Sequence, residues 1–193
     1  MTSCNIHATI DCSGYDCPMV LVQLKESLDR LEGGEIVEVI TEDTLNFQLV
    51  LKGWTSETND RYYDSFTEDQ KTHHYILKAM SHVRKEPMLF PNVITNTELK
   101  KLLTEKPIHI MDVREDIEFM LGHVPTAFNV PLSNFTENLA KFNQEETYYV
   151  ICRTGNRSDY ACKYMKKLGF NRVYNVLPGM VQWDGPVEEE DVI

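Results

Sequence analysis

The spacing of apolar residues in the first half of the chain switches between a strand period and a helix period. The expected elements are a strand over 6–10, a helix over 17–31, a strand over 35–41, a helix over 44–54, and strands over 62–66 and 73–78. Gly33-Gly34 ends the first helix, and the second is expected to bury Leu45, Phe47, Leu49 and Leu51. This βαβαββ order predicts an α/β, two-layer sandwich in which two helices cover one face of a small sheet.

In the second half, strands alternate regularly with helices. The expected strands are 108–111, 127–130, 148–151 and 172–174, with helices near 116, over 133–142 and over 158–168. The run from Thr95 to Glu98 has the spacing of a capping box and begins another helix through Leu102 and Leu103. Strands that alternate with helices imply right-handed crossovers, so a parallel sheet is expected here.

Between the halves, residues 81–91 carry several charges and two prolines and are the best candidate for a linker. The expected domains are therefore 1–80 and 92–193. At 193 residues in total, each domain lies near the lower limit of what buries its own core.

Charge excludes several function classes. The formal net charge of −11 argues against direct binding to nucleic acid or to an anionic membrane, both of which need basic patches. No apolar run approaches the roughly 18 residues of a membrane helix, and the N-terminal residues lack a signal-peptide pattern. A cytoplasmic location is the expectation that follows.

Five cysteines, an odd number, do not indicate a disulfide framework, so reactive thiols are sought instead. Two stand in activating surroundings, in different halves of the chain: Cys17, within Asp11–Pro18, and Cys152, within Cys152–Ser158. Two activated cysteines on separate modules suggest that something is handed from one sulfur to the other.

The run from Cys152 to Ser158 is a tight loop between an expected strand and an expected helix. Backbone N–H groups in such a loop form an anion nest that favours a thiolate or a persulfide anion, with help from Arg153 and Arg157. Cysteine phosphatases place five residues between their cysteine and arginine, whereas four lie between Cys152 and Arg157. The smaller ring suits a single sulfur atom.

Several ordered motifs over residues 90 to 188 resemble the rhodanese family. They are Met111–Glu115, Glu118-Phe119, Gly122–Pro125, Ala127–Pro131, Leu177–Met180 and Trp183, together with the loop. The resemblance implies a parallel sheet with helices on both faces and a persulfide-forming nucleophile at Cys152. One departure is Thr126, where the family usually has glycine.

The same resemblance implies roles for the residues around Cys152. The cradle that binds the substrate sulfur would be Arg153, Thr154, Gly155, Asn156 and Arg157, with Ser158 supporting the loop. Asp112 would brace the loop by supporting Arg157. Arg114 would lie at the rim of the pocket and guide an anionic donor. An inactive rhodanese-like domain that only binds a partner is the alternative.

Cys17 lies near the cap of the first helix, directly before Pro18, which suits a first helical turn. The positive end of a helix favours an ionised thiol there. Residues 5 to 80 are similar to the TusA family of sulfur carriers, through Asp11-x-x-Gly14-x-x-Cys17-Pro18 and a basic Lys25, although Val20 replaces the second proline of the family's pattern. The resemblance implies a sulfur-carrying Cys17; a plain helix cap without function is the alternative.

The remaining candidates are weaker. Cys12 is either a resolving thiol or, as we favour, a strand residue, and Cys162 is expected in the core of a helix. His73-His74 has no ligand-like spacing with the cysteines, so neither a metal nor another cofactor is predicted.

The combined interpretation is a sulfurtransferase that takes sulfane sulfur as a Cys152 persulfide and relays it to or from Cys17. The expected partners are a donor (thiosulfate, a small persulfide or a polysulfide) and a thiol or protein acceptor. A non-catalytic persulfide carrier that serves a partner protein is the second hypothesis. A phosphatase or arsenate reductase is the third, and the four-residue spacing speaks against it.

Overall fold

The computed structural model describes residues 5–15, 17–42, 45–86 and 88–190. The chain divides into two compact units, Met1–Met88 and Leu89–Ile193. This division falls inside the expected linker over 81–91, while the expected domain limits at 80 and 92 stay a prediction. No helix in the described ranges is long and apolar enough to cross a membrane.

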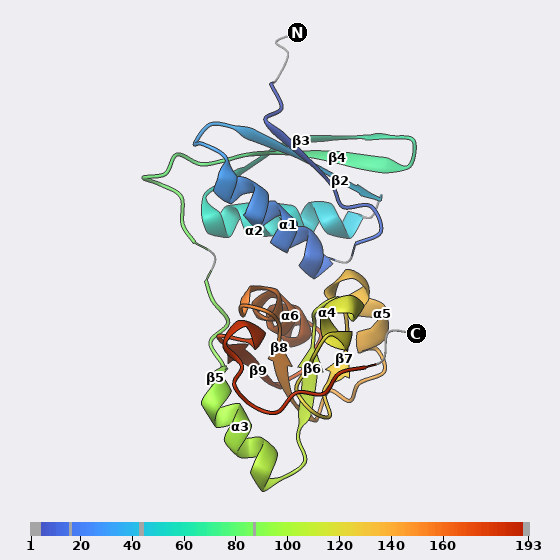
Figure 1. The fold of residues 1–193 in the computed structure, drawn as a ribbon. Coiled ribbons are helices and arrows are strands. Elements are labelled where there is room, and N and C mark those ends of the chain that lie inside the picture. Colours follow the sequence, from blue (N-terminus) through green and yellow to red (C-terminus); the bar gives the residue numbers. More distant parts are fainter. Residues whose placement is uncertain (1–4, 16, 43–44, 87, 191–193) are drawn as a thin grey trace. The chain divides into compact units, whose positions relative to one another are not determined.

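The first unit is a four-stranded mixed sheet with two helices on one face (Figure 1). Its elements are β1 (Ala8–Asp11), α1 (Cys17–Arg30), β2 (Ile36–Glu42), α2 (Leu45–Thr58), β3 (Arg61–Glu68) and β4 (Lys71–Leu77). The strand order is β1-β2-β4-β3, with β1 parallel to β2 and the other pairs antiparallel. The expected βαβαββ sandwich is confirmed.

The helices of this unit bury one stripe each. On α1, Val20, Leu24 and Leu28 recur every four residues and are at most 1% exposed, as the periodicity predicts. On α2, Leu51 and Trp54 are buried, but Leu49, expected in the core, is 64% exposed. That expectation is wrong because two residues turn a helix by about 200°, which places Leu49 opposite Leu51.

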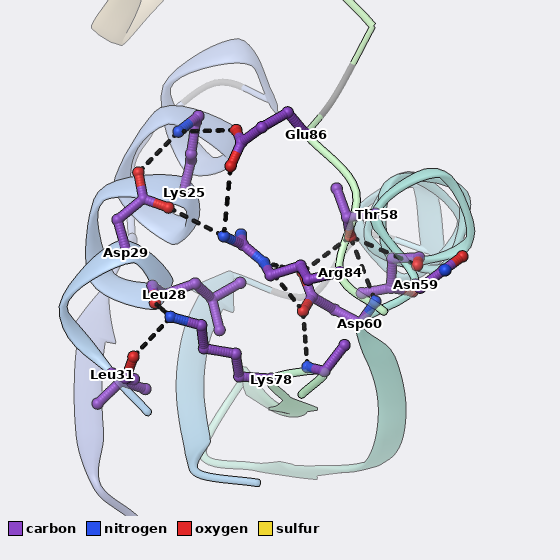
Figure 2. Close-up of polar contacts among 12 residues, drawn as sticks. Lys25, Leu28, Asp29, Leu31, Thr58, Asn59, Asp60, Lys78, Arg84 and Glu86 are labelled. Atoms are coloured by element: carbon purple, nitrogen blue, oxygen red, sulfur yellow. Dashed lines mark hydrogen bonds and ion pairs between the residues drawn. The ribbon is translucent and has the colours of Figure 1, made fainter. Parts of the chain in front are cut away.

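A buried ion pair fastens the segment after β4 to the first unit (Figure 2). Arg84 Nε lies 3.2 Å from both carboxylate oxygens of Asp60, and Arg84 Nη1 lies 3.0 Å from Asp29 on α1. The side chains of Arg84 and Asp60 are 9% and 0% exposed. Asp60 also accepts hydrogen bonds from the Thr58 hydroxyl and the Ala79 N–H. Residues up to Arg84 therefore belong to the fold of this unit.

The second unit is a five-stranded sheet in which every strand pair is parallel. Its strands are β5 (Val93–Thr95), β6 (His109–Asp112), β7 (Phe128–Asn129), β8 (Thr147–Ile151) and β9 (Arg172–Leu177), in the order β5-β9-β8-β6-β7. The parallel sheet is confirmed. The sequence did not predict β5, a short edge strand of three residues.

Helices cover both faces of this sheet. They are α3 (Asn96–Glu105), α4 (Asp116–Met120), α5 (Phe135–Leu139) and α6 (Asn156–Lys167), with 3-10 turns η1 (Leu132–Asn134) and η2 (Met180–Gln182). Leu99 of α3 packs with Val176, whereas α6 bonds to the neighbouring Asn175 through Ser158. Because adjacent strand residues face opposite ways, α3 and α6 lie on opposite faces. The capping box of Thr95 and Glu98 is also confirmed.

Thr126, the residue at which the chain departs from the rhodanese pattern, has a φ of +66°. Glycine reaches this left-handed region without strain, whereas a β-branched side chain rarely adopts it. The departure therefore stores local strain in the turn before β7.

Candidate active site

Cys152 lies directly after β8, at the start of the loop that leads into α6. Its Sγ accepts hydrogen bonds from the Gly155 N–H at 3.1 Å and from the Ser158 hydroxyl at 3.3 Å. Gly155 has a φ of +90° and precedes the first residue of α6. A cysteine sulfur with two donors at the start of a helix is suited to carry negative charge, as thiolate or as persulfide.

Asn175 of β9 supports this loop from the sheet. Its Oδ1 lies 2.7 Å from the Ser158 hydroxyl oxygen and shares that group's single hydrogen with Cys152 Sγ, and its Nδ2 donates to the Gly155 carbonyl at 3.2 Å. Sequence reasoning missed this residue, which is 3% exposed. The available signal was a lone amide within the otherwise apolar run Val173–Leu177, because a buried polar side chain needs partners.

The turn after β9 closes the loop from the other side. The N–H groups of Met180 and Val181 donate to the carbonyls of Cys152 and Arg153, both at 2.9 Å. Gly179 has a φ of +85°, and a Cβ there would lie 2.4 Å from the Cys152 carbonyl oxygen. Only glycine permits this close approach. The position of the Cys152 loop therefore depends on the turn at Gly179, which is distant in sequence.

Arg157 forms a two-pronged ion pair with Glu118 of α4. The two nitrogen–oxygen distances are 2.6 and 2.8 Å. These hydrogen bonds hold the pKa of Glu118 below its usual value. Burial opposes the charge of Arg157, but its bonds to Glu118 outweigh that effect and raise the pKa of the guanidinium. Both groups therefore stay ionised beside the loop.

The expected contact between Asp112 and Arg157 is wrong. The Asp112 carboxylate, 0% exposed, instead accepts hydrogen bonds from the backbone N–H, Nε and Nη2 of Arg114, at 2.6 to 3.0 Å. The reason is local: an aspartate at a strand end turns readily onto the N–H two residues later, which brings the Arg114 guanidinium with it.

Arg114 also departs from its expected place at the rim of the pocket. The residue is buried, and its Nη2 donates to the Gly122 carbonyl at 2.8 Å in addition to Asp112. Its guanidinium therefore ties the end of β6 to the turn after α4 and is not presented to a donor. The exposed members of the loop are Arg153, Thr154 and Asn156.

Cys17 is the first residue of α1, as its motif predicts, and its side chain lies outside the described residues. The turn before it is braced by Asp11, which accepts hydrogen bonds from the Ser13 N–H at 2.9 Å and from Lys71 Nζ at 3.1 Å. Hydrogen bonds from Ser13, then from Lys71, lower the pKa of Asp11 to about 2. The motif's aspartate therefore fixes the turn that leads into the helix start.

Lys25, the basic position of the TusA-like helix, is engaged within its own unit. Its Nζ lies 2.7 Å from Asp29 and 3.4 Å from Glu86, next to the Arg84 anchor (Figure 2). Burial opposes its charge, but the carboxylates outweigh burial and raise the pKa of Lys25. Through its ion pair with Glu86, Lys25 thus helps to hold the segment that follows β4 on the first unit.

The other described cysteines are core residues. Cys12 is 1% exposed, and burial, followed by the charge of Asp11, raises its thiol pKa to about 12. Cys162 is fully buried, and burial raises its pKa well above the usual value. The expectation of a core role for Cys162 is confirmed, and for Cys12 the structure favours packing over a resolving thiol.

Comparison with known proteins matches each unit to one family model. Residues 8–78 match "Sulfurtransferase TusA", and residues 95–185 match "Rhodanese-like domain". A putative sulfur carrier protein, YrkF of Bacillus subtilis (strain 168), is 30% identical over 93% of this chain and 96% of its own length. The chain belongs to the family of proteins that join a TusA domain to a rhodanese-like domain.

Relatives of the second unit alone are also found. The putative sulfurtransferase YtwF of Bacillus subtilis (strain 168) is 33% identical over 51% of this chain and 95% of its own. The crystal structure of a rhodanese-like domain protein from Staphylococcus aureus shows 37% identity with a TM-score of 0.49, over 52% of this chain and 99% of that chain. Together, the two domain matches and the two Bacillus subtilis relatives support sulfur transfer as the general activity.

Proposed function

We propose that the protein is a sulfurtransferase in which Cys152 takes up sulfane sulfur and exchanges it with Cys17. The observation that supports this most directly is the pair of donors, Gly155 N–H and Ser158 hydroxyl, on the Cys152 sulfur. They favour the ionised thiol needed for attack and the persulfide anion that results.

In the first step the Cys152 thiolate attacks the outer sulfur of a donor such as thiosulfate, a small persulfide or a polysulfide. A sulfur–sulfur bond forms at Cys152 Sγ, the donor's sulfur–sulfur bond breaks, and its electron pair leaves with sulfite or a thiolate. In the second step the Cys17 thiolate attacks the outer sulfur of the Cys152 persulfide, and the Cys152 thiolate is regenerated. A thiol or a protein acceptor then takes the sulfur from Cys17.

The expected domain limits and location belong to the same proposal. Residues 1–80 would be the carrier and 92–193 the rhodanese domain. Within the connection over 81–91, the ion pair of Arg84 with Asp60 holds the first residues on the carrier. A cytoplasmic location agrees with thiol chemistry, because reducing compartments keep cysteines free.

The test is peptide-level mass spectrometry after brief exposure of the full chain to thiosulfate and, separately, to glutathione persulfide. Wild type is compared with Cys152→Ser, Cys17→Ser and, as a matched control, Cys162→Ser. The proposal expects Cys17 to gain sulfur in wild type and in the control but not in Cys152→Ser. If Cys17 loads equally well without Cys152, the relay is refuted and the two cysteines are independent acceptors.

Mixing the variants tests whether the relay crosses between chains. Cys17→Ser chains, loaded at Cys152 and freed of donor, are added to unloaded Cys152→Ser chains. Sulfur on Cys17 of the second variant would indicate transfer between chains, and none, together with a working relay in wild type, would indicate transfer within one chain. A persulfide that reaches a protein thiol quickly but small thiols slowly would favour the second hypothesis, a carrier that serves a partner protein.

A further inference from the structure

The charges beside Cys152 are compensated within the protein. Arg157 is neutralised by Glu118 through two short hydrogen bonds, and Arg114 is neutralised by the buried Asp112. The sequence predicted that both guanidinium groups would interact with the anionic donor. In the structure each of them is instead paired with a carboxylate.

A count of the neighbouring charges gives no surplus of positive charge. Glu115 is the third carboxylate of the site, after Glu118 and Asp112, and its charge acts on Arg157. One of the Glu115 oxygens is buried without a hydrogen-bond partner among the described residues. Arg153 is the third cation, exposed on the loop. Three arginines and three carboxylates sum to zero, so the thiolate makes the site negative.

Donors differ in the charge that they bring to this site. Thiosulfate carries two negative charges on a compact ion, so its encounter with the thiolate brings together three negative charges. A persulfide of a neutral thiol, R–S–S−, brings only one and can also react as R–S–SH. In a site without surplus cations and partly shielded from water, each additional negative charge is costly.

We propose that Glu118 is a specificity-determining residue that makes Cys152 prefer the persulfide of a thiol over thiosulfate. This inference rests on the proposed function, namely that Cys152 accepts sulfane sulfur. Glu118 acts by cancelling the charge of Arg157, the cation that ends the loop after Cys152 and whose guanidinium donates two hydrogen bonds to the Glu118 carboxylate. The Glu118 carboxylate raises the free energy of binding a donor with two negative charges more than that of binding a donor with one.

The two loading reactions balance in the same way. With the persulfide, Cys152–S− and R–S–S− give Cys152–S–S− and R–S−; the new bond joins Cys152 Sγ to the outer sulfur, and the thiolate leaves with the electron pair. With thiosulfate, the same bond forms and sulfite leaves. No oxidant, reductant or further reactant is needed in either case.

The test compares the rates at which Cys152 of the full chain gains sulfur from 2-hydroxyethyl persulfide and from thiosulfate. The variants are Glu118→Gln, which removes the charge at nearly constant size, and Glu118→Asp, which keeps it. Glu145→Gln is the matched control, an exposed glutamate before β8, at the opposite end of that strand from Cys152. Rates are read by quenching and peptide mass spectrometry.

We expect wild type and Glu145→Gln to prefer the persulfide, and Glu118→Gln to shift the ratio of rates toward thiosulfate by about tenfold, the effect of one charge on one additional donor charge nearby. Glu118→Asp keeps the wild-type ratio even if both rates fall, which separates charge from a merely structural role. A ratio unchanged in Glu118→Gln, or a wild type that prefers thiosulfate, would overturn the inference but leave the proposed function standing. If neither donor loads Cys152, the proposed function itself fails.

Discussion

Arg84→Met is expected to destabilise the first unit strongly, because it leaves the buried carboxylate of Asp60 without its ion-pair partner. Asp60 is 0% exposed in its side chain and would lose both contacts with the guanidinium, each 3.2 Å long. Removing one partner of a buried pair costs about 3–5 kcal/mol. Asp60 keeps its bonds from Thr58 and Ala79, so we take the lower end, about 3 kcal/mol, a change of more than a hundredfold in the unfolding equilibrium.

The assay is urea unfolding followed by tryptophan fluorescence. The chain has two tryptophans, Trp54 in the first unit and Trp183 in the second, so a Trp183→Phe background reports the first unit alone. Lys85→Met is the matched control, because the neighbouring lysine is exposed and its side chain forms no hydrogen bond or ion pair with the described residues. A loss below about 0.5 kcal/mol for Arg84→Met, the range of ordinary surface changes, would refute the reasoning. It would also return residues 81–86 to the role of a free linker.

Three further changes test other parts of the chain. Ser158→Ala removes one of the two donors on Cys152 and is expected to slow its alkylation by iodoacetamide at neutral pH by about threefold to tenfold, the value of one hydrogen bond. Thr126→Gly relieves a left-handed backbone and is expected to raise the unfolding free energy of the second unit by about 1 kcal/mol; a loss of stability would contradict the strain argument. In native protein, iodoacetamide is expected to modify Cys152 well before Cys12 or Cys162, whose pKa values burial raises, and modification of either one first would contradict this order.

The parts of the fold that depend on local pattern were predictable. The order of strands and helices follows from periodicity, and the capping box of Thr95 and Glu98 follows from a spacing of three residues. The placement of Cys152 between a strand and a helix follows in the same way. Leu49 shows the limit of pattern, since choosing the buried stripe of α2 requires knowing how that helix sits on the sheet.

Pairing between distant side chains was not predictable. The sequence predicted Asp112 as the partner of Arg157, whereas the structure pairs Arg157 with Glu118. This pairing depends on where α4 places the Glu118 carboxylate. Asn175 reaches Ser158 across 17 positions in sequence, and Gly179 meets the loop only through the end of β9. Motifs therefore predicted Cys152 as the nucleophile, whereas the ion pairs around it had to come from the three-dimensional structure.

The described cysteines show that burial alone does not decide reactivity. Cys152 and Cys162 are both 0% exposed, and Cys12 is 1% exposed. A buried thiol without donors stays protonated, because its charge would lose hydration without replacement. Cys152 differs in having the Gly155 N–H and the Ser158 hydroxyl aimed at its sulfur, with Arg157 nearby. The loop thus supplies hydrogen-bond donors to the sulfur in place of the water that burial removes, and the same donors would bind the outer sulfur of a persulfide.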